Sequence, residues 1–403
     1  MVCSSRSFIM LGSDLPVSSS RRSEVGMRGT PEAQHPLYYV IDVEALIPAE
    51  HPLRAIKRRV DAELARLAPE FARRYSERGR PSIPPEQLLK ALLLQALYSI
   101  RSERLLVEEI GVNLRYRWFL DLRLDAPVWD ATTFTKNRER FAEGDLLQRF
   151  FDGVVRQAID DGLVSAEHFS VDGTLLQAWA SMKSVKPLTE RETTVADAAP
   201  EDDPGNPYVD FRGERRSNRT HRSITDPEAR LACKGQGQAA MLAYAGHALL
   251  EHRSGLCVAA SVTPALGGVE RPAALALLTH LRRRHRRLRP RTLAADKGYD
   301  AGAFLRALEE AHGIVPHVAI RRTAARGRTP EAAARRRARD RQRLRGFQVS
   351  QRWRKRLEEA WGWAKTIGGL RRLRHRGQWR VAQCLAVTLA AYNLVRLARL
   401  LPG

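Results

Sequence analysis

The chain has 403 residues, of which 43% are hydrophobic, which is enough for one large domain and a smaller one and excludes a disordered polymer. Its 68 Lys and Arg residues outnumber its 45 Asp and Glu residues and give a net charge of +23, which indicates a polyanionic partner, usually nucleic acid. Its four cysteines are scattered without a C-x-x-C pair, which argues against a zinc site or a disulfide framework and fits a reducing cytoplasm.

The beginning of the chain is rich in Ser, Arg and Gly and shows no periodicity, so we expect a disordered tail over residues 1–34. Met27 is an alternative start site, and with that start the tail would come from a wrongly assigned first codon.

Residues 35–150 predict an all-helical N-terminal domain. Apolar residues recur at helical spacing in 52–67 and in 102–110, and a further helix follows Ser82 and its two prolines. The segment Leu114–Leu120 mixes arginines with aromatic side chains. A basic helical module of this kind is typical of DNA binding, for example by a helix-turn-helix, and a helical packing domain without DNA contact is the alternative.

From residue 151 the pattern changes to alternating strands and helices, which predicts an α/β catalytic domain over 151–403. Residues 183–235 are polar and rich in Pro, Arg and Asp, and they predict a long insertion. A Gly-containing turn at 252–255 predicts a hairpin. The expected elements are strands 168–172, 246–251 and 256–263, helix 270–284, strand 292–296, helix 301–311, strand 314–320, an Arg-rich spacer 321–346, and helices 350–366 and 381–400.

No apolar run reaches the roughly 18 residues that are needed to span a bilayer. The longest candidate, residues 381–397, is interrupted by Gln383, Asn393 and Arg396. We therefore expect no membrane partner.

Two acids stand where predicted strands end, Asp172 in the first strand and Asp296 in the fourth. An acid at the carboxyl end of a strand points into the crevice where ligands of α/β sheets bind. Gly173 and Gly298 follow the two acids closely and relax the backbone there. The two acids are therefore candidates for one site.

The predicted helix 350–366 carries a third acid. Arg354, Glu358, Trp361 and Lys365 are spaced i, i+4, i+7 and i+11, so they lie on one helix face. An acid flanked by two cations suits a site where the acid holds a metal and the cations hold phosphates. A solvated face with ion pairs is the alternative, and Trp361 is either a core residue or a platform for DNA bases.

Three carboxylates without His or Cys partners select hard cations such as Mg²⁺ or Mn²⁺. Asp172, Asp296 and Glu358 are accordingly the candidate catalytic and metal-binding residues. Two such ions, about 3.5–4 Å apart, activate the attacking oxygen and stabilise the leaving oxygen in phosphoryl transfer. Glu359 is the rival third acid, but it lies about 100° round the helix from Glu358.

With these acids, the sequence resembles the DDE transposases of bacterial insertion sequences, in the group named for insertion sequence five and close to that named for insertion sequence four. The resemblance extends from about Pro52 to Leu400. The motifs that carry it are Ala49–Arg54 (AEHPLR), Ser170–Thr174 (SVDGT), Thr225–Pro227 (TDP), Ala295–Tyr299 (ADKGY), Leu357–Trp363 (LEEAWGW), Gly369–Gly377 (GLRRLRHRG) and Ala391–Leu394 (AYNL).

The resemblance implies a ribonuclease-H-like catalytic core with a mixed sheet and flanking helices. The family's third-acid signature is Tyr, two residues, Arg, three residues, Glu, six residues, Lys. Here Arg354, Glu358 and Lys365 fit that spacing, whereas Gln351 stands in place of the tyrosine, so this chain has no tyrosine at that position.

Further basic residues are candidates for DNA contact. Arg374, His375 and Arg376 follow the acid-bearing helix and join Arg354, Lys365 and Trp361 in the candidate DNA-binding set. The Arg-rich runs 282–287 and 321–345 are either phosphate contacts or solvated segments.

The sequence therefore predicts a transposase that acts in the cytoplasm, at the nucleoid. We expect it to bind double-stranded DNA, cut at the terminal inverted repeats of its element and join the freed 3′-hydroxyl to target DNA, as a homodimer or higher oligomer. A stand-alone nuclease and a non-catalytic DNA-binding regulator are the alternatives. End recognition by a basic N-terminal region favours the transposase over the nuclease, and the presence of all three acids argues against the regulator.

Overall fold

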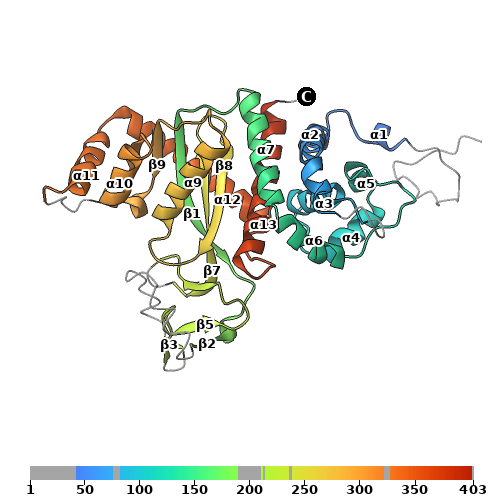
Figure 1. Ribbon diagram of the computed structural model, residues 1–403, viewed down its shortest axis with the longest axis horizontal. Helices are drawn as coiled ribbons and strands as arrows, with labels where there is room; N and C mark the ends of the chain where they lie inside the picture. Colours follow the sequence, from blue (N-terminus) through green and yellow to red (C-terminus); the bar gives the residue numbers. More distant parts are fainter. Residues whose placement is uncertain are drawn as a thin grey trace, which may run out of the picture. The chain divides into compact units, whose positions relative to one another are not determined.

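The structure is a computed structural model that describes residues 42–75, 82–188, 210–211, 214–235, 238–321 and 327–401. The tail expected over residues 1–34 lies outside the described residues. The helices and strands from Val43 onward belong to one unit, and Figure 1 labels them.

Helices make up the N-terminal part, and local signals explain where they begin. Pro52 opens the first long helix, and the His51 ring accepts a hydrogen bond from the backbone N–H of Leu53. The Ser102 hydroxyl caps another helix by accepting from the N–H of Leu105. The elements are α1 (Val43–Leu46), α2 (Pro52–Ala72), α3 (Pro85–Leu97), α4 (Glu103–Val112), α5 (Leu114–Phe119), α6 (Thr132–Ala142) and α7 (Leu146–Asp160).

A mixed sheet of six strands follows, in the order β10-β9-β1-β7-β6, with β8 also paired to β7. β1, β9 and β10 run parallel to one another, whereas β7 pairs antiparallel with β1, β6 and β8. The strands are β1 (His168–Gln177), β6 (Arg230–Ala232), β7 (Met241–Glu251), β8 (Cys257–Pro264), β9 (Thr292–Ala295) and β10 (Val315–Val318). The turn between β7 and β8 contains Gly255 with φ of 70°, so the predicted hairpin is confirmed.

Three sequence-based expectations differ from the structure. β1 does not end at Asp172 but continues to Gln177, because antiparallel pairing with β7 holds it extended. The predicted insertion at 183–235 is not all loop, because β6 lies within it and joins the main sheet. The short elements η1 (Met182–Ser184), β2 (Val185–Pro187), β3 (Asp210–Phe211), β4 (Glu214–Arg215) and β5 (His221–Ser223) lie at its start or within it, and residues 189–209 and 212–213 of it lie outside the described residues.

The Arg-rich spacer is the third difference, because it contains the helix α11 (Pro330–Arg341). Thr329 caps this helix and Pro330 occupies its first turn, a start signal that the run of arginines obscured. Its buried alanines pack toward α10 (Gly302–Glu310), and Arg337 and Arg341 both pair with Glu309 of α10. Part of the charge in this run is therefore used inside the fold.

Two helices cover opposite faces of the sheet beside β1. Neighbouring strand residues point to opposite faces. Gly173 faces Glu270, the first residue of α9 (Glu270–Arg284), whereas the next residue, Thr174, accepts a hydrogen bond from Lys365 of α12 (Arg345–Thr366). α9 and α12 therefore lie on different faces. Asp172, two residues before Thr174, is on the α12 face.

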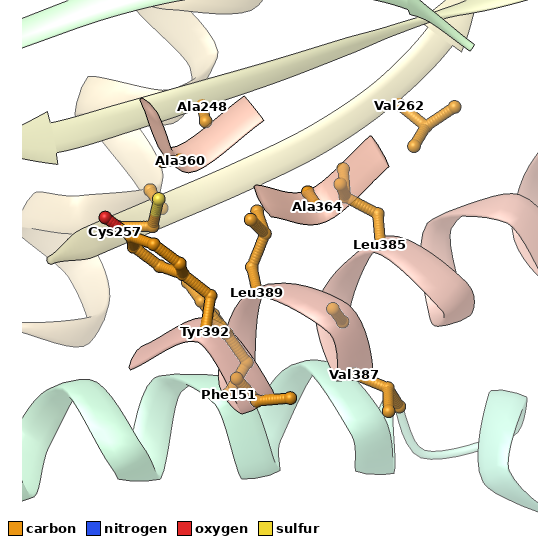
Figure 2. Close-up of a cluster of buried hydrophobic side chains, with 14 of the residues drawn as sticks. Phe151, Ala248, Cys257, Val262, Ala360, Ala364, Leu385, Val387, Leu389 and Tyr392 are labelled. Atoms are coloured by element: carbon orange, nitrogen blue, oxygen red, sulfur yellow. The ribbon is translucent and has the colours of Figure 1, made fainter. Parts of the chain in front are cut away.

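The last helix, α13 (Gln378–Leu400), lies in the hydrophobic core. Figure 2 shows Leu389 and Tyr392 of α13 among Phe151 of α7, Cys257 of β8 and Ala360 of α12. By length and composition α13 is able to cross a membrane, but 67% of its apolar window is buried inside the protein, as in a core helix. One core cluster therefore includes both the N-terminal helices and the sheet, and α7 is continuous across residue 150, where we placed the domain boundary.

Candidate active site

Asp172 and Asp296 occupy adjacent positions where β9 ends. The parallel pairing of β1 with β9 ends at Ser170 opposite Ala294, and two residues further along each chain are Asp172 and Asp296. Neighbouring strands lie about 4.8 Å apart, so this register brings the two carboxyl groups to one site. The backbone N–H of Gly173 donates to the Asp172 carboxylate over 2.9 Å, and that of Gly298 donates to the Asp296 carboxylate over 2.8 Å.

The electrostatics of Asp172 reflect this crowding. Burial raises the pKa of Asp172 from 3.8 to about 6, with a further increase from the negative charge of Asp296 and an opposing effect from Arg354. The folded protein thus disfavours the ionised form of Asp172 when no cation other than Arg354 balances it. A site of this kind gains from binding a positive charge.

α12 places Arg354 between two of the candidate acids. One terminal nitrogen of Arg354 lies 3.8 Å from Asp172 Oδ2, and the other lies 3.6 Å from Glu358 Oε1. The Glu358 side chain is 59% exposed, against 22% for Asp172, so Glu358 stands at the rim of the site. Within the described ranges, no three His, Cys, Asp or Glu side chains are grouped closely enough to hold a metal ion together. Arg354 is thus the link between Glu358 and the strand-borne acids.

Lys365 and Trp361 extend the same helix face along β1. The Lys365 ammonium donates a hydrogen bond to the hydroxyl of Thr174, and its pKa is lowered by burial and by the neighbouring Lys234 and Arg371. Trp361 is only 5% exposed, and a Cβ added at Gly246 of β7 would lie 3.3 Å from its ring. This burial favours the core role of Trp361 over the base-stacking role.

Gln351 stands where the transposase signature has tyrosine, and it connects α12 to two strands. Its side-chain amide donates to the carbonyl oxygen of Ala295, over 3.2 Å, and to that of His317, over 2.7 Å. Ala295 is the last residue of β9 and directly precedes Asp296. Gln351 therefore fixes the acid-bearing helix against the strand that ends in the second acid.

The three basic residues predicted to follow α12 differ in their surroundings. Arg374 donates to the backbone carbonyl of Ile100 over 2.8 Å, which ties this loop to the N-terminal helices. Burial, followed by the charges of Arg138 and Arg374, lowers the pKa of His375 to about 3, so this ring is neutral near pH 7. Arg376 is exposed. Of the three, Arg376 has the surroundings best suited to a phosphate contact.

One acid of this region was not predicted. Glu270 is half-buried at the first turn of α9, and a Cβ added at Gly173 would lie 3.2 Å from its carboxylate. A Cβ added at Gly298 would lie 3.4 Å from the other oxygen of Glu270 and 3.0 Å from Asp296 Oδ1. Burial and then the charge of Asp296 raise the pKa of Glu270. An acid in a helix's first turn reads as an ordinary start signal, so no sequence pattern separated it from others.

The donor set fits a hard divalent cation. Asp172 and Asp296, side by side at the end of β9, offer carboxylate oxygens, which are the ligands that Mg²⁺ and Mn²⁺ prefer. Tyr299 is fully buried, and its hydroxyl has no hydrogen-bond partner in the described part of the chain, although the charges of Glu270, Asp172 and Asp296 all act on it. An unpaired buried hydroxyl beside like-charged acids is costly, and a hydrated cation would satisfy both.

Comparison with known families decides what kind of protein carries this site. Residues 41–140 match the family described as Transposase domain (DUF772), and residues 219–394 match the family described as Transposase DDE domain. The chain belongs to the DDE transposases of insertion sequences. No curated protein and no solved structure is similar enough to be matched.

The transposase identity confirms the predicted fold and activity class. The mixed sheet with its flanking helices is the ribonuclease-H-like core of this family, and DDE transposases are metal-dependent nucleases and strand transferases that act on DNA. The matched DDE range contains Asp296 and Glu358 but begins after Asp172. The assignment of Asp172 therefore rests on its register with Asp296.

Proposed function

We propose that this transposase binds the terminal inverted repeats of its insertion sequence, hydrolyses a phosphodiester at the element ends and joins the freed 3′-hydroxyl to target DNA. The observation that carries this proposal is the adjacency of Asp172 and Asp296, with Arg354 bridging from Asp172 to Glu358. The enzyme acts in the cytoplasm, at the nucleoid.

In this proposal, Asp172, Asp296 and Glu358 hold two Mg²⁺ or Mn²⁺ ions. Bound divalent ions supply activation of the attacking oxygen and stabilisation of the leaving oxygen. The chain's own part is positioning. Arg354, already held beside Asp172 and Glu358, presents further N–H donors for a phosphate oxygen. Lys365 adds a second cation beside Thr174, the next residue of β1 after Asp172 on the same face of the sheet.

The surface next to the site supports DNA as the substrate. Trp179 is 46% exposed just beyond the end of β1, and the guanidinium of Arg372 lies 5.3 Å from the centre of its ring. A bridge between Gln177 and Arg372 fixes this pair beside the catalytic strand. Exposed cations with an aromatic ring suit contacts to phosphates and bases.

The helical N-terminal region, residues 35–150, is proposed to read the repeats, in keeping with its match to a transposase domain. Pairing two element ends in one complex requires a homodimer or a higher oligomer on DNA. Arg374, His375 and Arg376 remain candidate DNA contacts, with Arg376 the best placed by exposure, whereas the burial of Trp361 favours its core role over DNA contact.

The test is strand cleavage by single-residue variants on a labelled duplex that carries an end of the element. Asp172→Ala, Asp296→Ala and Glu358→Ala are expected to abolish cleavage, while a gel shift on the same duplex stays within a few fold, because phosphate contacts elsewhere supply most of the affinity. Glu359→Ala is the matched control and is expected to keep most activity, since Glu359 lies 3.8 Å from Arg396 of α13 and not beside Arg354.

Two results would contradict the assignment. If Glu359→Ala is inactive and Glu358→Ala cuts normally, the third acid is Glu359. If all three ligand variants still cut, the protein does not use this site for its chemistry.

A further inference from the structure

Glu270 is an acid without a partner in a place where acids accumulate. In the described ranges it forms neither a hydrogen bond nor an ion pair, although it is half-buried and other acids of this domain, such as Glu309 and Asp300, pair with arginines. Both glycines that follow the catalytic acids face it, so Gly173 and Gly298 leave the space that its carboxylate occupies. A Cβ at Gly173 would be in tight contact with the Glu270 carboxylate, at 3.2 Å, and one at Gly298 would be in van der Waals contact with it, at 3.4 Å.

The position of Glu270 relative to the sheet explains how it reaches the site. Asp172 lies on the α12 face of β1, whereas Glu270 approaches from the α9 face. Beyond the end of β9 at Ala295, Asp296 and Glu270 both border Gly298, because a Cβ there would lie 3.0 Å from Asp296 Oδ1 and 3.4 Å from Glu270 Oε2. Glu270 therefore lies at the side of the aspartate pair that is away from α12.

A second, independent observation points to a ligand at this place. The Tyr299 hydroxyl is fully buried without a partner, and the three acids whose charges act on it are Glu270, Asp172 and Asp296. His247 of β7, opposite Gly173, is fully buried too, and its Nδ1 has no partner. Unpaired buried polar atoms beside three like charges indicate a site that is completed by a hydrated cation.

We propose that Glu270 is a fourth carboxylate of the active site, and that a divalent cation draws it from the α9 face together with Asp172 and Asp296, because without the cation no three acids of the described residues are grouped closely enough to hold an ion. This inference rests on the proposed two-metal function and deepens it. Glu270 and Asp296 border the same glycine, Gly298, whereas Glu358 is exposed and pairs with Arg354.

The test measures Mn²⁺ binding to the full-length protein without DNA, so its readout does not depend on cleavage. Glu270→Gln is expected to weaken Mn²⁺ binding about 10-fold or more, as loss of a group that supports a metal site does. Glu270→Asp keeps the charge but withdraws it by one methylene, and it is expected to bind with intermediate affinity. Glu310→Gln is the matched control, because Glu310 is an exposed acid of α10 that pairs with Arg306.

Thermal unfolding in the presence of chelator distinguishes a purely structural role of Glu270 from a role in cation binding. Glu270→Gln removes repulsion with Asp296, so its unfolding midpoint without cations should equal or exceed that of the wild type, and Mn²⁺ should raise it less. A lower midpoint in chelator, with Mn²⁺ binding like that of Glu310→Gln, overturns the inference.

An Asp172→Asn variant separates failure of the fourth-carboxylate inference from failure of the proposed function. If Asp172→Asn loses Mn²⁺ binding while Glu270→Gln binds like the wild type, the fourth-carboxylate inference fails and the proposed function stands. If Asp172→Asn also binds like the wild type, the proposed function fails.

Discussion

Without bound cations, the negative charge of Asp172 should lower the free energy of unfolding of the transposase. Asp172→Asn, which removes this charge, should raise the free energy of unfolding again. Burial and then the charge of Asp296 raise the pKa of Asp172 from 3.8 to about 6 in the folded chain. A difference of this size corresponds to about 3 kcal/mol of preference for the neutral carboxyl in the folded state. Asparagine has almost the same shape and cannot ionise, so it removes the preference.

The folded and unfolded states release the Asp172 proton at different pH values, so the free energy of unfolding depends on pH. The folded state holds the Asp172 proton up to pH of about 6, whereas the unfolded chain releases it near 3.8. Wild-type stability therefore contains a contribution that is complete below pH 3.8 and is lost as the pH rises through 6. Relative to wild type, Asp172→Asn should have about the same free energy of unfolding near pH 4 and one larger by about 3 kcal/mol at pH 8.

Urea unfolding followed by tryptophan fluorescence, in chelator at pH 4, 6 and 8, measures this difference. Addition of Mg²⁺ at pH 8 should shrink or reverse it, because a bound cation favours the ionised carboxylate. A free-energy difference that is the same at all three pH values, or an asparagine variant that is less stable than wild type at pH 8, refutes the reasoning. Either result would mean that the burial of Asp172 and its proximity to Asp296 do not lower the free energy of unfolding as expected.

Three further predictions test other parts of the structure. Gln351→Leu leaves the carbonyls of Ala295 and His317 without their donor, so it should lower the free energy of unfolding by about 1–3 kcal/mol and slow cleavage with little change in DNA affinity, as measured by urea unfolding and the cleavage assay. The logarithm of duplex affinity should fall steeply with the logarithm of salt concentration, and a flat response in a titration would mean that the net charge of +23 does not engage phosphates. Mg²⁺ or Mn²⁺ should support cleavage and Ca²⁺ only binding, whereas full cleavage in excess chelator would contradict a metal-dependent site.

Local sequence patterns were sufficient for most elements and for much of the site. The helix 270–284, the β7–β8 hairpin and the strand before Asp296 appear where periodicity and turn residues placed them. The i, i+4, i+7, i+11 spacing brought Arg354 and Lys365 to one face of α12, and both contact β1. These features depend on residues close in sequence, which is why their period and caps reveal them.

The tertiary structure alone decided which residues meet across the chain. Asp172 looked like a strand end, but pairing with β7 extends β1 beyond it, and the parallel register with β9 is what brings Asp296 alongside. Trp361 had two interpretations, and only packing against Gly246 placed it in the core. Glu270 carried no signal, because its proximity to the aspartates depends on where β9 ends and on two glycines distant from it in sequence. Register and burial are set by long-range pairing, which a local period does not contain.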